Sequence, residues 1–247
     1  MPTLDNLTVR IGKGGQRDSA EAFAKRNGVE ISDKDGDGLT LLYDASGVTL
    51  TGYGLSFRGD FAGMLHRITD GRLAHEMLVR VAKTKTESPK AADATAGMGE
   101  DSILLAAAGY DVTLFERDPV VAALLKDALR RAKKDPTLSP IVARMHLVEG
   151  NSIALMPGLV REPEVVYLDP MFPARQKSGL INKKLQLIQK LESPETDGDA
   201  LFESALSCDP TKIIIKRPLK GEYLAGRAPD YSVTGKAIRY DVIVLKK

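Results

Sequence analysis

The sequence has a single cysteine, almost no net charge and no long apolar run, and each of these limits the class of protein. Because Cys208 is the only cysteine among 247 residues, no disulfide can form within the chain, and we expect a reducing compartment. A formal net charge of +2 does not by itself predict a polyanionic partner. No apolar run is long enough to cross a bilayer, and the first ten residues lack the apolar segment of a secretory signal. We therefore expect a soluble, cytoplasmic protein without a membrane partner.

Patterns of metal-binding residues are also scarce. The only histidines are His66, His75 and His146, and their spacing does not form a zinc motif. The segment DKDGDG at residues 33–38 resembles a calcium-binding loop, but runs typical of strands flank it where such a loop requires helices. The sequence therefore predicts no metal site.

The first 70 residues predict a small N-terminal α+β subdomain. Two runs typical of strands, Leu39–Tyr43 and Gly47–Thr51, flank a short polar turn, which is the pattern of a hairpin. Residues 16–26 carry apolar side chains at helical spacing. Beyond residue 70 the pattern changes, so we expect a second domain over residues 71–247.

Residues 71–247 predict an α/β domain. Short apolar runs typical of strands alternate with helical patterns, which favours a mostly parallel sheet covered by helices on both faces. These runs lie near residues 91–95, 111–115, 145–148, 165–168 and 213–215. A last strand near residues 238–245 follows without an intervening helix, so we expect an antiparallel edge.

A glycine-containing loop, DATAGMGED at residues 93–101, follows the first strand of this domain. Gly97 and Gly99 let the backbone approach a ligand closely, and the helix that follows presents free N–H groups. Glu116 ends the second strand, where a carboxylate can accept hydrogen bonds from ribose hydroxyls. The loop and this acid together predict a nucleoside-containing ligand.

The spacing of the loop distinguishes between ligands of this kind. Ser102 stands where the dinucleotide fingerprint has a third small residue that allows close packing under a pyrophosphate. A ligand with a ribose but no phosphate fits better, and S-adenosylmethionine is such a ligand. Its usual loop reads acid-x-Gly-x-Gly-x-Gly. Asp93 supplies the acid here, and Thr95 replaces the first glycine.

Asn151 and Ser152 follow the third strand, after Gly150. Their polar side chains could bind the amino group of an adenine. Either side chain could equally cap the helix that begins here. The two interpretations are compatible, and the sequence leaves both open.

The fourth strand ends in VVYLDPMFPARQKS, at residues 165–178. Open α/β sheets bind ligands at the carboxyl ends of their strands, so Asp169 is expected beside the cofactor. We expect the Asp169 carboxylate to accept the hydrogens of an exocyclic amine on a nucleobase. Phe172 is expected to stack on the ring of that base. These two residues are the predicted catalytic pair.

Four segments together resemble the ribosomal RNA small subunit methyltransferase J family. They are DATAGMGED, LFERDPVVAALLKDALRRA, VVYLDPMFPARQKS and IIIKRP, and the resemblance covers about residues 50–245. It implies a Rossmann-like class I methyltransferase fold. It also implies transfer of a methyl group from S-adenosylmethionine to the N2 amine of a guanosine in small-subunit (16S) ribosomal RNA. The expected partner is that RNA or a ribosomal particle.

The resemblance also implies a set of cofactor-binding residues. By position in the motifs, these are Glu100 and Asp101, Glu116 and Arg117, Asn151 and Ser152, and Asp169. Two of them depart from the family pattern. Glu100 stands where an arginine is expected, so that contact can be through the backbone alone, and Asn151 stands where a serine is common.

Cations gather near two of the predicted strand ends. The stretch from residue 175 to 190 holds five cations and no acid. Four cations flank the predicted base pocket and are the expected contacts to RNA phosphates. They are Arg175, Lys177, Lys216 and Arg217.

Two other functions are compatible with this fold. A nicotinamide-dependent oxidoreductase is disfavoured by Ser102 and by the lack of a histidine or tyrosine cluster suited to hydride transfer. A non-catalytic RNA-binding module, such as a ribosome assembly factor, would keep the fold without its chemistry. Fold alone does not separate these functions.

Overall fold

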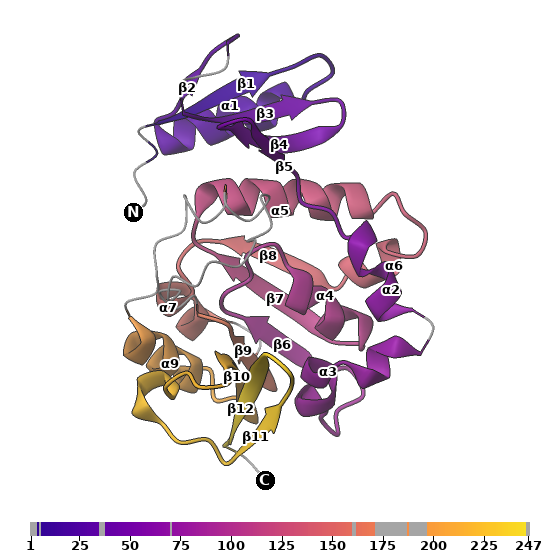
Figure 1. Cartoon of the computed structure of the whole chain (residues 1–247), viewed down its shortest axis with the longest axis vertical. Coiled ribbons are helices and arrows are strands. Elements are labelled where there is room, and N and C mark those ends of the chain that lie inside the picture. The colour runs from indigo at the N-terminus through magenta and orange to yellow at the C-terminus, as the bar shows by residue number, and fades with distance from the viewer. Residues whose placement is uncertain are drawn as a thin grey trace.

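The computed structural model describes residues 4, 6–34, 38–69, 71–159, 162–170, 187 and 197–245. Two β-sheets organise this part of the chain, and the smaller one lies beside a helix of the larger unit (Figure 1). The predicted residues Phe172, Arg175 and Lys177 lie outside the described residues.

The N-terminal part is a five-stranded sheet in the order β2-β1-β3-β4-β5. The side chains of Leu39, Leu41 and Tyr43 alternate along one strand and are all buried, because they share the face that packs against a helix. The elements are β1 (Leu7–Ile11), α1 (Arg17–Asn27), β2 (Glu30–Ile31), β3 (Leu39–Asp44), β4 (Gly47–Gly52) and β5 (Leu55–Phe57). The predicted hairpin is the antiparallel pair β3–β4.

Short helical segments connect the two sheets. Phe61, Met64 and Ile68 within them already pack into the hydrophobic core of the larger sheet. The segments are η1 (Ala62–Met64), α2 (Leu65–Ile68), η2 (Arg72–His75) and α3 (Met77–Ala82). The chain therefore stops packing with the small sheet and begins to pack with the larger sheet before residue 70, close to the end of β5.

The larger sheet has seven strands in the order β11-β12-β10-β9-β6-β7-β8. Its strands are β6 (Lys90–Asp93), β7 (Asp111–Glu116), β8 (Met145–Glu149), β9 (Val165–Leu168), β10 (Lys212–Pro218), β11 (Tyr231–Thr234) and β12 (Ile238–Val244). The predicted parallel α/β sheet is confirmed. The antiparallel strand is β12, one place in from the edge, since β11 pairs antiparallel with β12 and so runs with the other strands.

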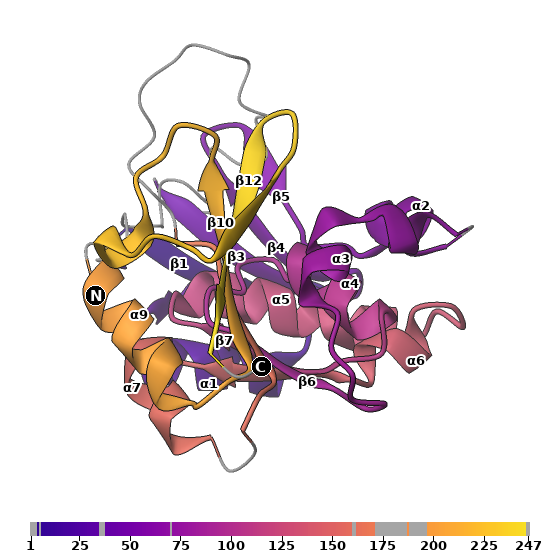
Figure 2. The ribbon, with the colours of Figure 1, turned by 90° about the horizontal axis from the view of Figure 1, so that it is seen from below.

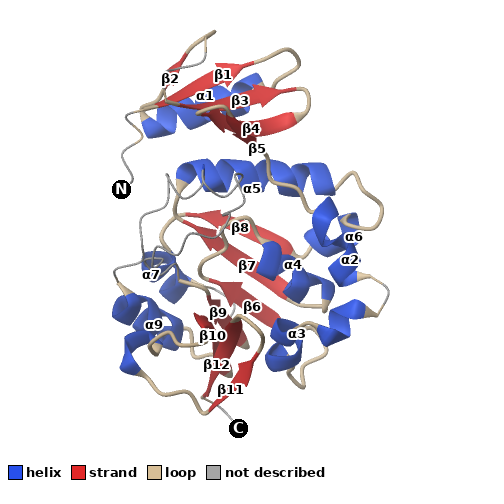
Figure 3. Cartoon of the chain, viewed as in Figure 1, coloured by secondary structure: helices blue, strands red, loops and turns tan. Residues whose placement is uncertain are grey.

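Helices cover both faces of this sheet (Figure 3). One face carries α3 and α4, with part of α5, and the other carries α7, η3 and α9. The chain connects them in the order α4 (Glu100–Ala107), α5 (Pro119–Ala132), α6 (Ser139–Val142), α7 (Ser152–Leu155), η3 (Met156–Gly158), α9 (Gly198–Ser207) and η4 (Leu224–Gly226). This two-sided cover explains why β9 and the middle of β10, Ile213 to Ile215, are apolar and buried on both faces.

A buried carboxylate fastens the small sheet to α5. Asp127 is 4% exposed, and its Oδ2 accepts a hydrogen bond from the backbone N–H of Val48 at 2.9 Å. Its two oxygens also pair with Arg130 and Arg131, each at 2.7 Å. Gly47 allows this approach, because a Cβ there would lie 2.3 Å from the Asp127 Oδ2. The small sheet is thus held by a charged, specific contact as well as by apolar packing.

Candidate active site

The predicted site residues lie where the strand order of the larger sheet reverses. β6 and β9 are neighbours, and the chain leaves β6 toward β7 on one side and β9 toward β10 on the other. In open α/β sheets the carboxyl ends of strands at such a reversal form the ligand-binding crevice. The glycine loop follows β6, and Asp169 follows β9.

The glycine loop has a backbone conformation that only glycine adopts readily. Gly97 and Gly99 have φ values of +52° and +75°. A Cβ at Gly99 would meet the Leu125 Cδ1 at 3.0 Å, so this glycine packs against α5. A Cβ at Gly97 would meet no protein atom within 4 Å. Gly97 therefore borders open space, as a loop that approaches a ligand does.

Asp93 is the acid that precedes this loop, and it is fully buried. Its Oδ2 accepts a hydrogen bond from the Ser102 hydroxyl at 2.5 Å, and its Oδ1 accepts one from the Thr95 N–H at 3.1 Å. These bonds fix both ends of the loop. Burial, only partly offset by these donors, raises the pKa of Asp93 to about 7. With 1% exposure, the Asp93 side chain is shielded from solvent and shapes the loop through these hydrogen bonds.

Substitution of Asp93 should change how stability depends on pH. Because the folded-state pKa is raised to about 7, the wild type loses stability as the pH rises from about 4 through 7. Asp93→Asn removes this titration. When the pH rises from about 5.5 to 7.5, we expect the free energy of unfolding of the wild type to fall by about 2 kcal/mol more than that of the variant. Urea unfolding at the two pH values measures this difference, and parallel losses in both proteins would contradict it.

Glu116 ties the end of β7 to the glycine loop. Its Oε2 accepts the Gly97 N–H at 2.9 Å, and its Oε1 accepts the Asp118 N–H at 2.7 Å. Asp118 in turn caps α5 by accepting the N–H groups of Val120 and Val121. The carboxylate is thereby fixed at the carboxyl edge of the sheet.

The remaining predicted cofactor residues surround this edge. The Asn151 side chain caps α7, since its Oδ1 accepts the Ile153 N–H at 3.0 Å, and the residue is exposed. Ser152 is buried at the first position of that helix. Glu100 and Arg117 are exposed. The capping interpretation therefore holds for Asn151, and it does not prevent the exposed amide from binding a base.

Asp169 belongs to a partly buried charged cluster. The Lys216 ammonium lies 2.9 Å from the Asp169 Oδ2 and 2.8 Å from the Asp101 Oδ2. The Tyr167 hydroxyl donates to the same Asp101 oxygen at 2.6 Å. The Asp169 N–H donates to the Thr95 hydroxyl at 2.7 Å, which joins the β9 exit to the glycine loop. One cation thus orients two carboxylates at the edge of the cofactor crevice.

The structure changes two expectations about RNA contacts. Lys216 was expected to bind a phosphate, but its ammonium is held between two carboxylates and its side chain is 25% exposed. Arg217 was also expected to bind a phosphate, but it is 3% exposed. The Lys216 ammonium is therefore already paired with carboxylates, and the Arg217 side chain is almost wholly covered. The physical reason is that successive side chains of a strand point to opposite faces of the sheet. Lys216 therefore points toward the charged cluster, and Arg217 points toward the other face, where it is buried.

Sequence reasoning missed the roles of Tyr167 and Lys216. Part of the signal was present, because Tyr167 in β9 and Asp169 directly after that strand are two residues apart, a spacing that puts side chains on one face. Lys216 on β10 lies one residue past Ile215, which pairs with Leu168. Placing Lys216 beside Asp169 required the strand register, and the sequence did not supply it.

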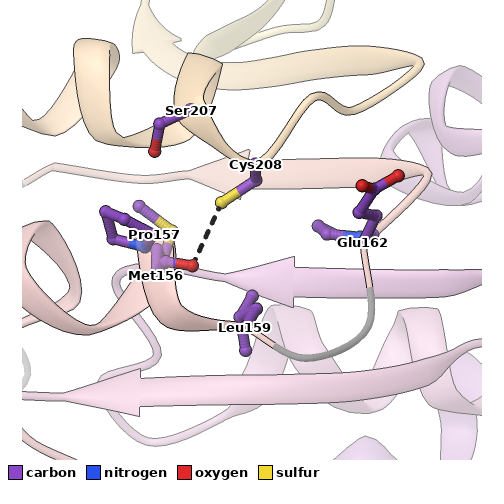
Figure 4. A pocket seen from close by; sticks show the side chains of 7 residues that line it. Met156, Pro157, Leu159, Glu162, Ser207 and Cys208 are labelled. Atoms are coloured by element: carbon purple, nitrogen blue, oxygen red, sulfur yellow. Dashed lines mark hydrogen bonds between the residues drawn. The ribbon is translucent and has the colours of Figure 1, made fainter.

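Other candidate sites are weak in the described part of the chain. Among the described residues no group of three or more His, Cys, Asp or Glu side chains could hold a metal ion. None of the described helices is long and apolar enough to span a membrane. Figure 4 shows a pocket lined by Met156, Glu162 and Cys208. Glu162 precedes β9 and Asp169 follows it, so the pocket lies toward the opposite end of that strand. The Cys208 thiol donates to the Met156 carbonyl at 3.4 Å, and burial raises its pKa, so it is a packed thiol.

Comparison with known proteins gives a consistent result. A family model described as "Putative SAM-dependent methyltransferase" matches residues 33–245. The chain is 37% identical over 244 residues to "Ribosomal RNA small subunit methyltransferase J" of Pseudomonas aeruginosa, covering 96% of this chain and 94% of the relative. It is 38% identical to the protein of that name from Thioalkalivibrio sulfidiphilus, covering 96% and 97%. A crystal structure of a SAM-dependent methyltransferase from Neisseria gonorrhoeae matches with a TM-score of 0.75 and 32% identity, covering 96% and 95%.

Proposed function

Because this chain belongs to the ribosomal RNA small subunit methyltransferase J family, we propose that it methylates the exocyclic N2 amine of a guanosine in small-subunit (16S) ribosomal RNA, with S-adenosylmethionine as the methyl donor. The single observation that carries the chemistry is the Asp169 carboxylate. It leaves β9 beside the glycine loop and is oriented by Lys216.

The cofactor site fits S-adenosylmethionine by the chemistry of its donors. The open space at Gly97 suits the close approach of a ligand, and the Glu116 carboxylate suits ribose hydroxyls. The exposed Asn151 side chain suits an adenine edge. The proposed set is completed by Asp93, Gly99, Glu100, Asp101, Arg117, Ser152 and Asp169. S-adenosylmethionine supplies a methyl group on a sulfonium, which is an excellent leaving group.

The Asp169 carboxylate is proposed to accept the hydrogens of the guanine amine. The lone pair of that nitrogen is delocalised into the base, so the free amine is a poor nucleophile. Hydrogen bonds to a fixed carboxylate orient the nitrogen and stabilise the positive charge that develops during transfer. Holding the two reactants in line contributes up to roughly 7–11 kcal/mol in favourable cases. Phe172, outside the described residues, is proposed to stack on the base.

Lys216 is proposed to position Asp169. Burial raises the pKa of Asp169 above its ordinary value, and the Lys216 ammonium offsets part of that rise. A carboxylate with a raised pKa accepts a hydrogen bond more strongly. Burial alone lowers the pKa of Lys216. The Asp101 and Asp169 carboxylates together have the larger effect and raise that pKa above its ordinary value. The lysine therefore stays charged and keeps the Asp169 oxygens in one orientation.

The substrate is proposed to be the RNA itself or an assembling subunit particle in the cytoplasm. Arg175 and Lys177, outside the described residues, remain the proposed phosphate contacts. The alternative of a non-catalytic assembly module predicts cofactor and RNA binding without transfer. A nicotinamide oxidoreductase predicts binding of a dinucleotide in place of S-adenosylmethionine.

The test is methyl transfer in vitro. The purified protein, S-adenosylmethionine and small-subunit particles or RNA from cells lacking this protein are incubated together. The RNA is then digested and its nucleosides are identified by mass spectrometry. We expect N2-methylguanosine at one position, absent without the protein. Binding of the cofactor with no transfer to either substrate would favour the assembly module, and binding of a nicotinamide dinucleotide alone would favour the oxidoreductase.

A further inference from the structure

An exposed tyrosine lies on a buried arginine just beyond the carboxyl end of β10. Tyr223 is 46% exposed, although aromatic rings usually bury most of their surface. The Arg239 Cζ lies 5.3 Å from the centroid of the Tyr223 ring, within the range of a cation–π contact. Arg239 itself is 8% exposed. One face of the ring is thus covered by the guanidinium, and nearly half of the residue's surface remains accessible to solvent.

The arginine under this ring is fixed. All five of its donors have protein acceptors at 2.7–3.0 Å. Three bonds hold the loop that carries the tyrosine, through the carbonyls of Pro218, Leu219 and Gly221. The other two form a bidentate pair with Asp241. The fixed guanidinium therefore holds the Tyr223 ring in one position, so the ring has little conformational freedom to lose when it binds a ligand.

The position of this ring relative to Asp169 follows from the strand register. Arg239 pairs with Arg217, and the neighbouring residue on β10, Lys216, contacts Asp169. β10 and β12 lie side by side in both views of the molecule (Figures 1 and 2). Because side chains alternate along a strand, Arg239 and Asp169 project from opposite faces of the sheet at the same edge. Tyr223 is therefore near the catalytic crevice but outside it.

From this geometry we propose that Tyr223, supported by Arg239, is a stacking site for an RNA base that flanks the target guanosine. Base–aromatic stacking tolerates every base, because each presents a π face. An aromatic ring that is held by a fixed cation and is nearly half exposed suits this contact. A position outside the crevice suits a neighbouring nucleotide and excludes the target itself. The proposal rests on the proposed function only for the identity of the RNA.

The test uses a fluorescein-labelled single-stranded RNA of about 16 nucleotides, whose binding does not require catalysis. Tyr223→Leu covers Arg239 with an apolar side chain but removes the ring, and Tyr223→Phe keeps the ring. We expect Tyr223→Leu to weaken RNA binding roughly tenfold and Tyr223→Phe to bind within about twofold of wild type. Affinity for S-adenosylmethionine should be unchanged in both variants.

Tyr231 provides the matched control. It lies on β11 and is 43% exposed. Its partner on β12 is Val242, which is three residues beyond Arg239 and so farther from the edge of the sheet where Tyr223 lies. Tyr231→Leu should bind RNA as the wild type does. Wild-type RNA affinity in Tyr223→Leu, or an equal loss in Tyr231→Leu, would overturn the proposal. A lowered melting temperature in Tyr223→Leu with unchanged RNA affinity would assign the ring to shielding Arg239 only. Loss of methyl transfer in the wild type would instead contradict the proposed function and leave this binding test intact.

Discussion

Asp169→Asn is expected to lower kcat for methyl transfer by roughly 10²–10³-fold while the protein still binds S-adenosylmethionine. The amide has nearly the shape of the carboxylate, so the change removes charge and leaves the packing. Losing one preorganised group that stabilises charge in a transition state costs a factor of this size in other enzymes. Radiolabelled methyl transfer to subunit RNA gives kcat, and calorimetric titration gives the cofactor affinity.

Lys216→Met is the companion variant for this prediction. It removes the ammonium that lies 2.9 Å from the Asp169 Oδ2 and leaves Asp101 and Asp169 without their shared cation. If Lys216 acts by positioning Asp169, the double variant should lose no more than about the larger of the two single losses. Independent, multiplying losses would assign Lys216 a separate role. Wild-type kcat in Asp169→Asn would remove Asp169 from the proposed chemistry.

Asp127→Ala is expected to lower the free energy of unfolding by about 3 kcal/mol, at the lower end of the range for breaking a buried ion pair. The change leaves the half-buried Arg131 guanidinium without its carboxylate and the Val48 N–H without its acceptor. The contact between the small sheet and α5 should weaken first. Urea unfolding followed by circular dichroism measures the loss, and hydrogen exchange should show faster exchange in β4.

The control for Asp127→Ala is Glu21→Ala. Glu21 pairs with Arg17 at 3.2 Å, but the two side chains are 52% and 68% exposed, so its loss should change stability by less than about 0.5 kcal/mol. Although burial opposes it, pairing with Arg131 lowers the pKa of Asp127 below its ordinary value. Its stabilising effect is therefore present above the unfolded-state pKa and is lost in acid. An equal loss of stability in both variants at neutral pH would contradict this account.

Sequence patterns predicted the α/β domain because its signals are local. Each central strand is a short apolar run, and the helices between them have apolar faces of the right period. The position of β12 could not be predicted in this way. Whether a last strand joins the edge of the sheet or inserts beside β10 depends on which strands pair with it. The residues of the strand alone do not indicate that pairing.

The same distinction applies to the site. The motif positions of Asp93, Gly97 and Glu116 correctly indicated residues at the carboxyl edge. The partners of their side chains were not predictable. Asp101 meets Tyr167 and Lys216 only because three separate elements converge, and charge alone made Lys216 look like a phosphate contact.

The attachment of the small sheet to α5 has a consequence for measuring distance. Asp118 caps the start of α5, and its N–H donates to Glu116. Asp127 contacts β4 two and a half turns later, about 14 Å along the helix. α5 therefore holds the small sheet at a fixed distance from the carboxyl edge of the larger sheet. If the proposed RNA substrate contacts the small sheet, that contact would hold the target amine at a constant distance from it.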